Sequence, residues 1–217
     1  MIPNLASDQK KIWLFPLQVA RGNDVVPTAA VLGASAGMVA LDPTDTPYFR
    51  RTSAFGGFNR VFTSKATISA TLAVPVSLYA AGLLRKDSKM QATALLAGEA
   101  VADTYLVTTV MKDIDRRLQP IAIPPNGNFA DTWFKDNSRY GLSDGSFPSG
   151  HSIAAFSVAT VVARRYGKRR RWIPCLAYGL AGVVGFSRIT LSAHFVSDVF
   201  VGGVLGYSIS RFTVLRQ

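Results

Sequence analysis

The chain has 217 residues, a length that fits a single domain, and 48% of them are hydrophobic, a high share for a soluble protein. Its formal net charge of +11 predicts an anionic partner: nucleic acid, an anionic lipid surface or a phosphorylated substrate. The single cysteine, Cys175, excludes an internal disulfide bond, and its place in an apolar run predicts a small buried hydrophobic residue.

Residues 1–24 are expected to form an N-terminal arm, followed by a single helical domain over residues 25–217. Two lysines precede an apolar stretch in the arm, but Pro16 interrupts it and no small-residue cleavage site is obvious, so no secretory signal peptide is predicted. Trp13 and Phe15 stand beside basic residues, which fits either an arm lying at a membrane interface or an ordinary packed arm.

Six apolar segments are compatible with helices, and strand-like alternation is weak throughout, which predicts an all-α fold, a six-helix bundle. The segments cover residues 25–41, 66–84, 90–111, 151–163, 172–186 and 195–209. A helix that spans a bilayer needs about 20 apolar residues. The second and third segments reach that length, whereas the first is marginal and the last three are short enough to be core helices of a soluble protein. Small-residue pairs such as Gly202 and Gly206 favour the close packing of membrane helices.

The distribution of charge favours a multi-pass protein of the cell membrane. If all six segments span, the basic residues of the arm, of the 85–89 and 164–171 turns and of the C-terminus share one side. The acidic residues Asp42, Asp45, Asp113, Asp115, Asp131, Asp136 and Asp144 all fall on the other. This is the positive-inside pattern, with a cytoplasmic N-terminus. A nucleic-acid partner is not expected, because no aromatic or strand-based platform accompanies the basic turn.

The stretch from Lys112 to Gly150 is rich in Pro, Gly, Asn and Asp, so we expect a loop or a broken helix there. It ends in the sequence Pro-Ser-Gly-His, where Ser149 is a typical helix cap and Gly150 lets an anion approach the backbone. Free N–H groups at a helix N-terminus bind phosphate, and His151 would face that anion and could donate a proton. On its own, the pattern is more typical of a simple helix cap.

The second histidine, His194, precedes Asp198 by four residues, so the two share one face of a helix. A carboxylate that accepts a hydrogen bond from one imidazole nitrogen fixes the tautomer and leaves the other nitrogen nucleophilic. Arg188 adds a planar set of donors that matches phosphate oxygens. Taken alone, such a His–Asp pair is commonly structural, and an isolated arginine can be a surface residue.

Together, these residues resemble the motifs of the type 2 phosphatidic acid phosphatases, a superfamily that includes bacterial acid phosphatases and vanadium haloperoxidases. The family motifs are K-x6-R-P, P-S-G-H and S-R-x5-H-x3-D. The second is complete at residues 148–151, and the third at Ser187, Arg188, His194 and Asp198. The three motifs occur in the family's order between residues 112 and 198.

The first motif departs from the family pattern, because Lys112 and Pro120 are present but Gln119 stands at the arginine position. On a continuous helix, a seven-residue step would place Lys112 and Gln119 on one face. Glutamine can hydrogen-bond a phosphate oxygen but adds no charge. Arg116 could compensate if the helix continues, and Arg117 could do so if the chain breaks near Pro120.

The resemblance implies a phosphatase that works through a phosphohistidine. His194 would attack phosphorus, Asp198 would orient it, and His151 would protonate the leaving oxygen. Charge on the phosphate would be stabilised by Lys112, Arg188, Ser149 and the Gly150 backbone N–H. No metal and no other cofactor is expected.

The expected substrate is a phosphorylated lipid, such as phosphatidate or a polyprenyl diphosphate, at an active site on the extracytoplasmic side. The alternatives are a soluble periplasmic acid phosphatase, a vanadium haloperoxidase, or a catalytically impaired lipid-binding membrane protein with Gln119 as the sign of decay. The sequence leaves the oligomeric state open. Glu99 and Asp103, two acids within one apolar segment, are expected to have a structural role.

Overall fold

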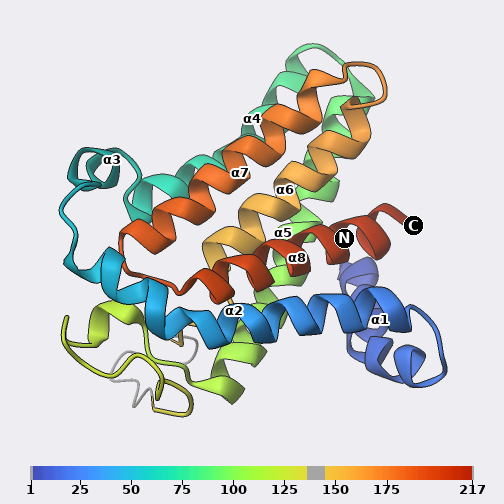
Figure 1. The fold of residues 1–217 in the computed structure, drawn as a ribbon. Coiled ribbons are helices and arrows are strands. Elements are labelled where there is room, and N and C mark those ends of the chain that lie inside the picture. Colours follow the sequence, from blue (N-terminus) through green and yellow to red (C-terminus); the bar gives the residue numbers. More distant parts are fainter. Residues whose placement is uncertain (1, 136–144, 217) are drawn as a thin grey trace.

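A computed structural model describes residues 2–135 and 145–216, and every regular element in these ranges is helical (Figure 1). The α-helices are α1 (Ile2–Ala20), α2 (Val25–Arg51), α3 (Gly56–Val61), α4 (Ser64–Leu84), α5 (Ser88–Asp115), α6 (Gly150–Tyr166), α7 (Trp172–Thr190) and α8 (Val196–Phe212). The short 3₁₀ helices are η1 (Pro120–Ala122) and η2 (Val214–Arg216). All six predicted segments are helices, so the all-α prediction is confirmed; Asp136 and Asp144 lie outside the described residues.

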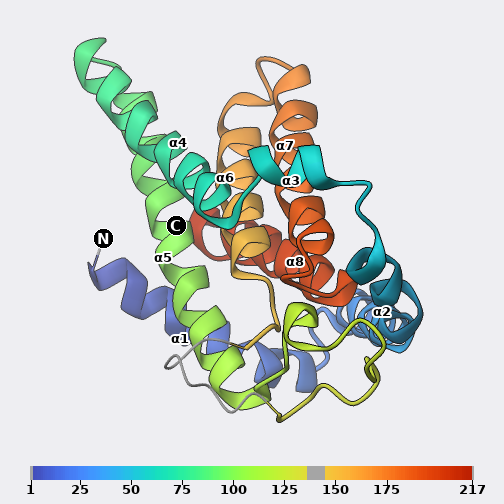
Figure 2. The same cartoon turned by 90° about the vertical axis from the view of Figure 1, so that its left-hand side faces the viewer.

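Two helices lie where the sequence predicted none, and one is longer than predicted. The N-terminal arm contains α1, which crosses α5 (Figure 2), and α3 is a single short helix between α2 and α4. Helix α2 continues ten residues past its predicted end, through Asp42, to Arg51. The charge of Asp42 does not end the helix because the side chain is buried and paired with Arg117, at 2.7 Å.

Within residues 2–135 and 145–216, five helices are long and apolar enough to cross a bilayer: α2, α4, α5 with its extension to Ala122, α7, and α8 with its extension to Arg216. Many of their large apolar side chains face outward, as expected where the surroundings are lipid rather than water. Cys175 is exposed, so the prediction of a buried cysteine is wrong. It lies on α7 beside exposed Leu176 and Leu180, and on a membrane helix hydrophobic character does not imply burial inside the protein.

Helix α6 lies at the centre of the fold, against α5, α7, α8 and α4. Its contact with α8 depends on glycine. A Cβ added at Gly206 would lie 2.4 Å from the carbonyl oxygen of Ile153, and one at Gly202 would lie 2.7 Å from that of Ser149. The Ser149 N–H donates to the Asp198 carbonyl at 3.0 Å. The predicted small-residue pair therefore lets the starts of α6 and α8 lie side by side.

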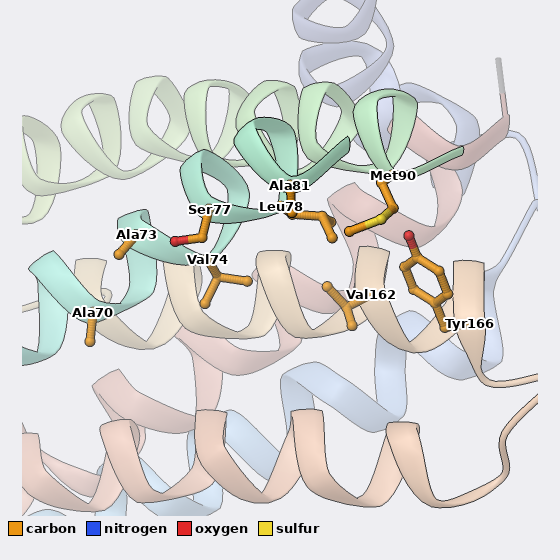
Figure 3. A pocket seen from close by; sticks show the side chains of 9 residues that line it. All are labelled: Ala70, Ala73, Val74, Ser77, Leu78, Ala81, Met90, Val162 and Tyr166. Atoms are coloured by element: carbon orange, nitrogen blue, oxygen red, sulfur yellow. The ribbon is translucent and has the colours of Figure 1, made fainter. Parts of the chain in front are cut away.

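An apolar groove of about 480 Å³ runs between α4 and α6 (Figure 3). Val74 and Leu78 of α4 and Val162 of α6 point into it, and Met90 and Tyr166 lie near one end. None of the predicted site residues lines this groove, and its apolar character suits a surface in contact with lipid chains.

The glycine contact generates a matched pair of variants. Gly206→Ala should lower the melting temperature in detergent, because overpacking of this kind costs about 1–3 kcal/mol. Gly179→Ala on α7, where an added Cβ would meet no atom within 4 Å, should be neutral or stabilising by about 0.4–1 kcal/mol. Equal melting temperatures for the two variants would show that α6 and α8 are not packed through Gly206.

Candidate active site

Four helix ends meet at the motif residues. Lys112 lies near the end of α5, His151 is the second residue of α6, Arg188 lies near the end of α7, and His194 lies between α7 and α8. His151 is close enough to Arg188, His194 and Lys112 for their charges to act on it, and Lys112 acts on His194 in the same way. The structure therefore brings together the two histidines and the two cations that the sequence motifs single out.

The imidazole of His194 is buried, and its Nδ1 lies 2.7 Å from the backbone oxygen of Ser146. A carbonyl oxygen can only accept a hydrogen bond, so Nδ1 carries the proton and Nε2 of the neutral ring has a free lone pair. Burial lowers the pKa of His194, while the nearby Asp198 carboxylate opposes that shift. The ring is therefore held neutral, in the tautomer that a nucleophile at Nε2 requires.

Asp198 supports this ring, but not through a close hydrogen bond. Its Oδ2 lies 3.6 Å from His194 Nδ1. The same oxygen accepts hydrogen bonds from the hydroxyl of Ser146 and from the N–H of Phe195, the latter at 2.8 Å. Ser146 thus contacts both the histidine and the aspartate, a position that no predicted motif includes.

The other oxygen of Asp198 accepts a hydrogen bond from Arg117, at 2.5 Å. Arg117 also donates to Asp42 at 2.7 Å, to Ser197 at 2.8 Å and to Thr132 at 3.2 Å. All three of its side-chain nitrogens thus donate hydrogen bonds within the protein. Arg117, Asp42 and Asp198 are each at most 1% exposed, so we define these three residues as the buried ion network.

The predictions for the first motif need correction. Helix α5 ends at Asp115, and Arg116 caps it in the left-handed conformation with φ of 41°, so Lys112 and Gln119 do not share a helix face. Arg116 is exposed and donates to the Asp113 carbonyl. Arg117 points into the buried ion network, where it contacts Asp42 and Asp198. Gln119 directly precedes η1.

Arg188 is fully buried and held from three directions. Its guanidinium donates to the hydroxyl of Ser64 at 2.8 Å, to the carbonyl of Phe62 at 2.7 Å and to the hydroxyl of Ser187 at 2.9 Å. The ring of His151 contacts the same short segment, with Nε2 lying 3.0 Å from the carbonyl oxygen of Ser64. The start of α4 therefore positions both residues, although no motif marks Ser64 in the sequence.

The start of α6 has the predicted cap. Ser149 is buried and accepts hydrogen bonds from the backbone N–H and the hydroxyl of Ser152, at 3.4 and 3.0 Å. Gly150 is the first residue of the helix, and a Cβ added there would come no closer than 3.7 Å to Thr108. Packing of the protein alone therefore does not require glycine at this position.

The acids of α5 lie in a separate cluster with the N-terminal helix. Carboxylate oxygens of Asp8, Glu99 and Asp103 lie within 4.8 Å of one another and are buried. Gln9 donates to Asp103 at 2.8 Å, and Lys11 pairs with Asp8 at 3.1 Å. The Gln9–Asp103 bond ties α1 to α5, whereas the Lys11–Asp8 pair lies within α1. The bond is in line with the structural role expected for Asp103.

Three known proteins match parts of the chain. It is 40% identical over 66 residues to the lipid A 1-phosphatase of Porphyromonas gingivalis, and the matched stretch covers 30% of this chain and 15% of that protein. It is 40% identical over 68 residues to phosphatidylglycerophosphatase B of Bacillus subtilis, covering 28% and 34%. A bacitracin transport permease protein, BcrC of Bacillus licheniformis, is 29% identical over 123 residues, covering 57% and 55%. The matched stretches thus span only part of each relative.

A transmembrane PAP2-type phosphatidylglycerolphosphate phosphatase from Bacillus subtilis has the same overall fold. The TM-score is 0.50 at 22% identity, over 96% of this chain and 94% of that one. A family model described as the PAP2 superfamily matches residues 91–217, more than half of the chain and the part that contains the motif residues gathered in the structure. The chain therefore belongs to the PAP2 superfamily.

Proposed function

We propose that this protein is a membrane phosphatase that removes phosphate from a phosphorylated lipid through a phosphohistidine at His194. The observation that carries the proposal is the hydrogen bond from His194 Nδ1 to the Ser146 carbonyl, which leaves Nε2 as the nucleophilic atom of a neutral ring. Lys112, His151 and Arg188 lie around this ring, so an anion there meets two cations and a proton donor.

In the first step, Nε2 of His194 forms a bond to phosphorus as the bond from phosphorus to the leaving oxygen breaks. His151 donates a proton to that oxygen, and Asp198 stabilises the positive ring of His194. A phosphate beside His151 favours the protonated form that this donation needs. In the second step, water attacks phosphorus, His151 takes its proton, and phosphate leaves neutral His194 behind.

The phosphate oxygens would be bound by Lys112, Arg188 and the N–H groups at the start of α6. Arg188 is already oriented by Ser64, Ser187 and Phe62, so binding costs it little side-chain freedom. The room beside Gly150 admits a phosphate oxygen close to the backbone. Gln119 would add a neutral hydrogen bond in place of the usual arginine charge.

A lipid substrate is supported by the five apolar helices and by relatives that are named as lipid phosphatases. We infer a lipid monophosphate or diphosphate of the phosphatidate or polyprenyl type. The arrangement of charges supports an active site on the extracytoplasmic side of the cell membrane, opposite the basic 164–171 turn.

Phosphate release from a panel of lipid and soluble phosphates tests this function. The wild-type protein should release phosphate, and His194→Ala should lower the rate about a thousandfold or more, because the nucleophile is lost. Cys175→Ala, at an exposed position on α7, is the control and should keep the wild-type rate. Equal inactivity of wild type and His194→Ala on every substrate would favour a lipid-binding protein without catalysis.

The pH dependence follows from the state of His194. Its pKa is lowered by burial from the usual value of about 6.5, so the ring binds a proton only at more acidic pH and stays nucleophilic below pH 6.5. We expect the acid limb of kcat/KM to have its midpoint below about 6.5. Asp198→Asn should slow the reaction and move that limb further to acid pH, because the carboxylate that favours the charged ring is gone. A midpoint above about 6.5 for the wild-type protein would contradict the assignment of neutral His194 as the nucleophile.

The role of Arg117 can be separated from phosphate binding. Arg117→Met should cost about 3–5 kcal/mol of stability, because two buried carboxylates lose their partner, and should lower kcat more than it raises KM. Arg116→Met, at the exposed neighbouring position, should change stability by less than about 0.5 kcal/mol. A large rise in KM with kcat unchanged would instead identify Arg117 as a phosphate ligand.

A further inference from the structure

A second polar site lies at the opposite ends of α6, α7 and α8 from the motif residues. Helix α6 starts at Gly150 beside the histidines and ends at Tyr166, roughly 24 Å away by its helical rise. A cavity of about 600 Å³ opens at that far end, between the last turns of α6 and α8 and the start of α7. It shares no residue with the proposed catalytic site.

Four cationic side chains line this cavity: Arg164, Arg165, Lys168 and Arg211. No carboxylate is among its lining residues, and in the described part of the chain none of the four cations forms an ion pair. Arg165 is held in place, because its Nε donates to the hydroxyl of Thr93 at 3.2 Å. Like charges gathered in a cavity repel one another, so a bound anion would stabilise this arrangement.

The remaining wall of the cavity is apolar and aromatic. The rings of Tyr178 and Tyr207 lie 6.4 Å apart, and Pro174 and Leu215 complete the lining beside them. The hydroxyl of Tyr178 donates to Thr160 at 3.3 Å, which fixes this ring. A cationic side next to an apolar side suits an amphiphile with an anionic head.

We propose that this cavity binds the phosphate-bearing headgroup of an anionic membrane lipid, with the glycerol and the first chain carbons against the tyrosines. The location supports a lipid over a soluble phosphate, because the cavity lies at ends of α7 and α8, two helices long and apolar enough to cross a bilayer, where headgroups meet the protein. The groove of Figure 3 differs in this respect, since no charged residue lines it. The lipid joins the ends of three helices and thereby stabilises the bundle, independently of catalysis.

Binding can be measured on the full chain in neutral detergent by titrating phosphatidylglycerol and following lipid adducts by native mass spectrometry and the melting temperature. The test variant carries R164Q, K168Q and R211Q. The matched control carries R169Q, R170Q and R171Q, which removes the same charge from the adjacent turn outside the cavity. We expect saturable binding to the wild type, binding weakened about tenfold or more in the test variant, and a change of less than about twofold in the control.

Equal weakening in the two triple variants would overturn the proposal, because diffuse attraction to basic residues would then explain the binding. An equal rise in melting temperature with inorganic phosphate that is lost in the test variant would assign the cavity to a soluble anion instead. Equal binding of phosphatidylcholine would exclude charge recognition. Both triple variants should release phosphate at the wild-type rate, which shows that they are folded. If the test variant is unfolded, the single variant R211Q replaces it, and R170Q is its control.

Discussion

The arrangement of the candidate active site depends on one buried interaction, the guanidinium of Arg117 between the carboxylates of Asp42 and Asp198. Taking three charges out of water is costly, and the cost is offset only when each group is paired and hydrogen-bonded. The network is complete because Ser197 and Thr132 add polar partners. It joins α2, the chain after α5 and the start of α8, and so fixes the carboxylate that lies beside His194.

Two further constraints set the geometry around Asp198 and His194. Glycines at the contact of α6 and α8 allow Ser149 to bond to the backbone of Asp198, so the caps of both helices lie together. The start of α4 holds Arg188 and contacts His151 through one short segment. Groups with directed hydrogen bonds are thus in place before a phosphate arrives, which is the condition under which electrostatic stabilisation is most effective.

Much of this could be read from the sequence, because apolar periodicity and motif spacing are local properties. The six apolar segments and the residues of the second and third motifs were predicted, and they lie on the helices or at the helix ends expected, except that His194 does not share a helix face with Asp198. His194 lies between α7 and α8, before the N-cap of α8. The inward turn of Arg117 could not be predicted, since it depends on Asp42, which is 75 positions away. Ser64 and Ser146 were missed for the same reason, and Cys175 was misjudged because a lipid-facing surface is itself apolar.

We propose that the neutral ring of His194 attacks phosphorus through Nε2 while Nδ1 stays hydrogen-bonded to the Ser146 carbonyl. The most direct measurement is to quench the enzyme during turnover of a lipid phosphate, under alkaline conditions that preserve phosphohistidine. Mass spectrometry and ³¹P NMR would then locate the phosphoryl group. We expect a phosphoryl group on Nε2 of His194 and none in His194→Ala. A phosphoryl group on Nδ1, or on any other residue, would contradict it.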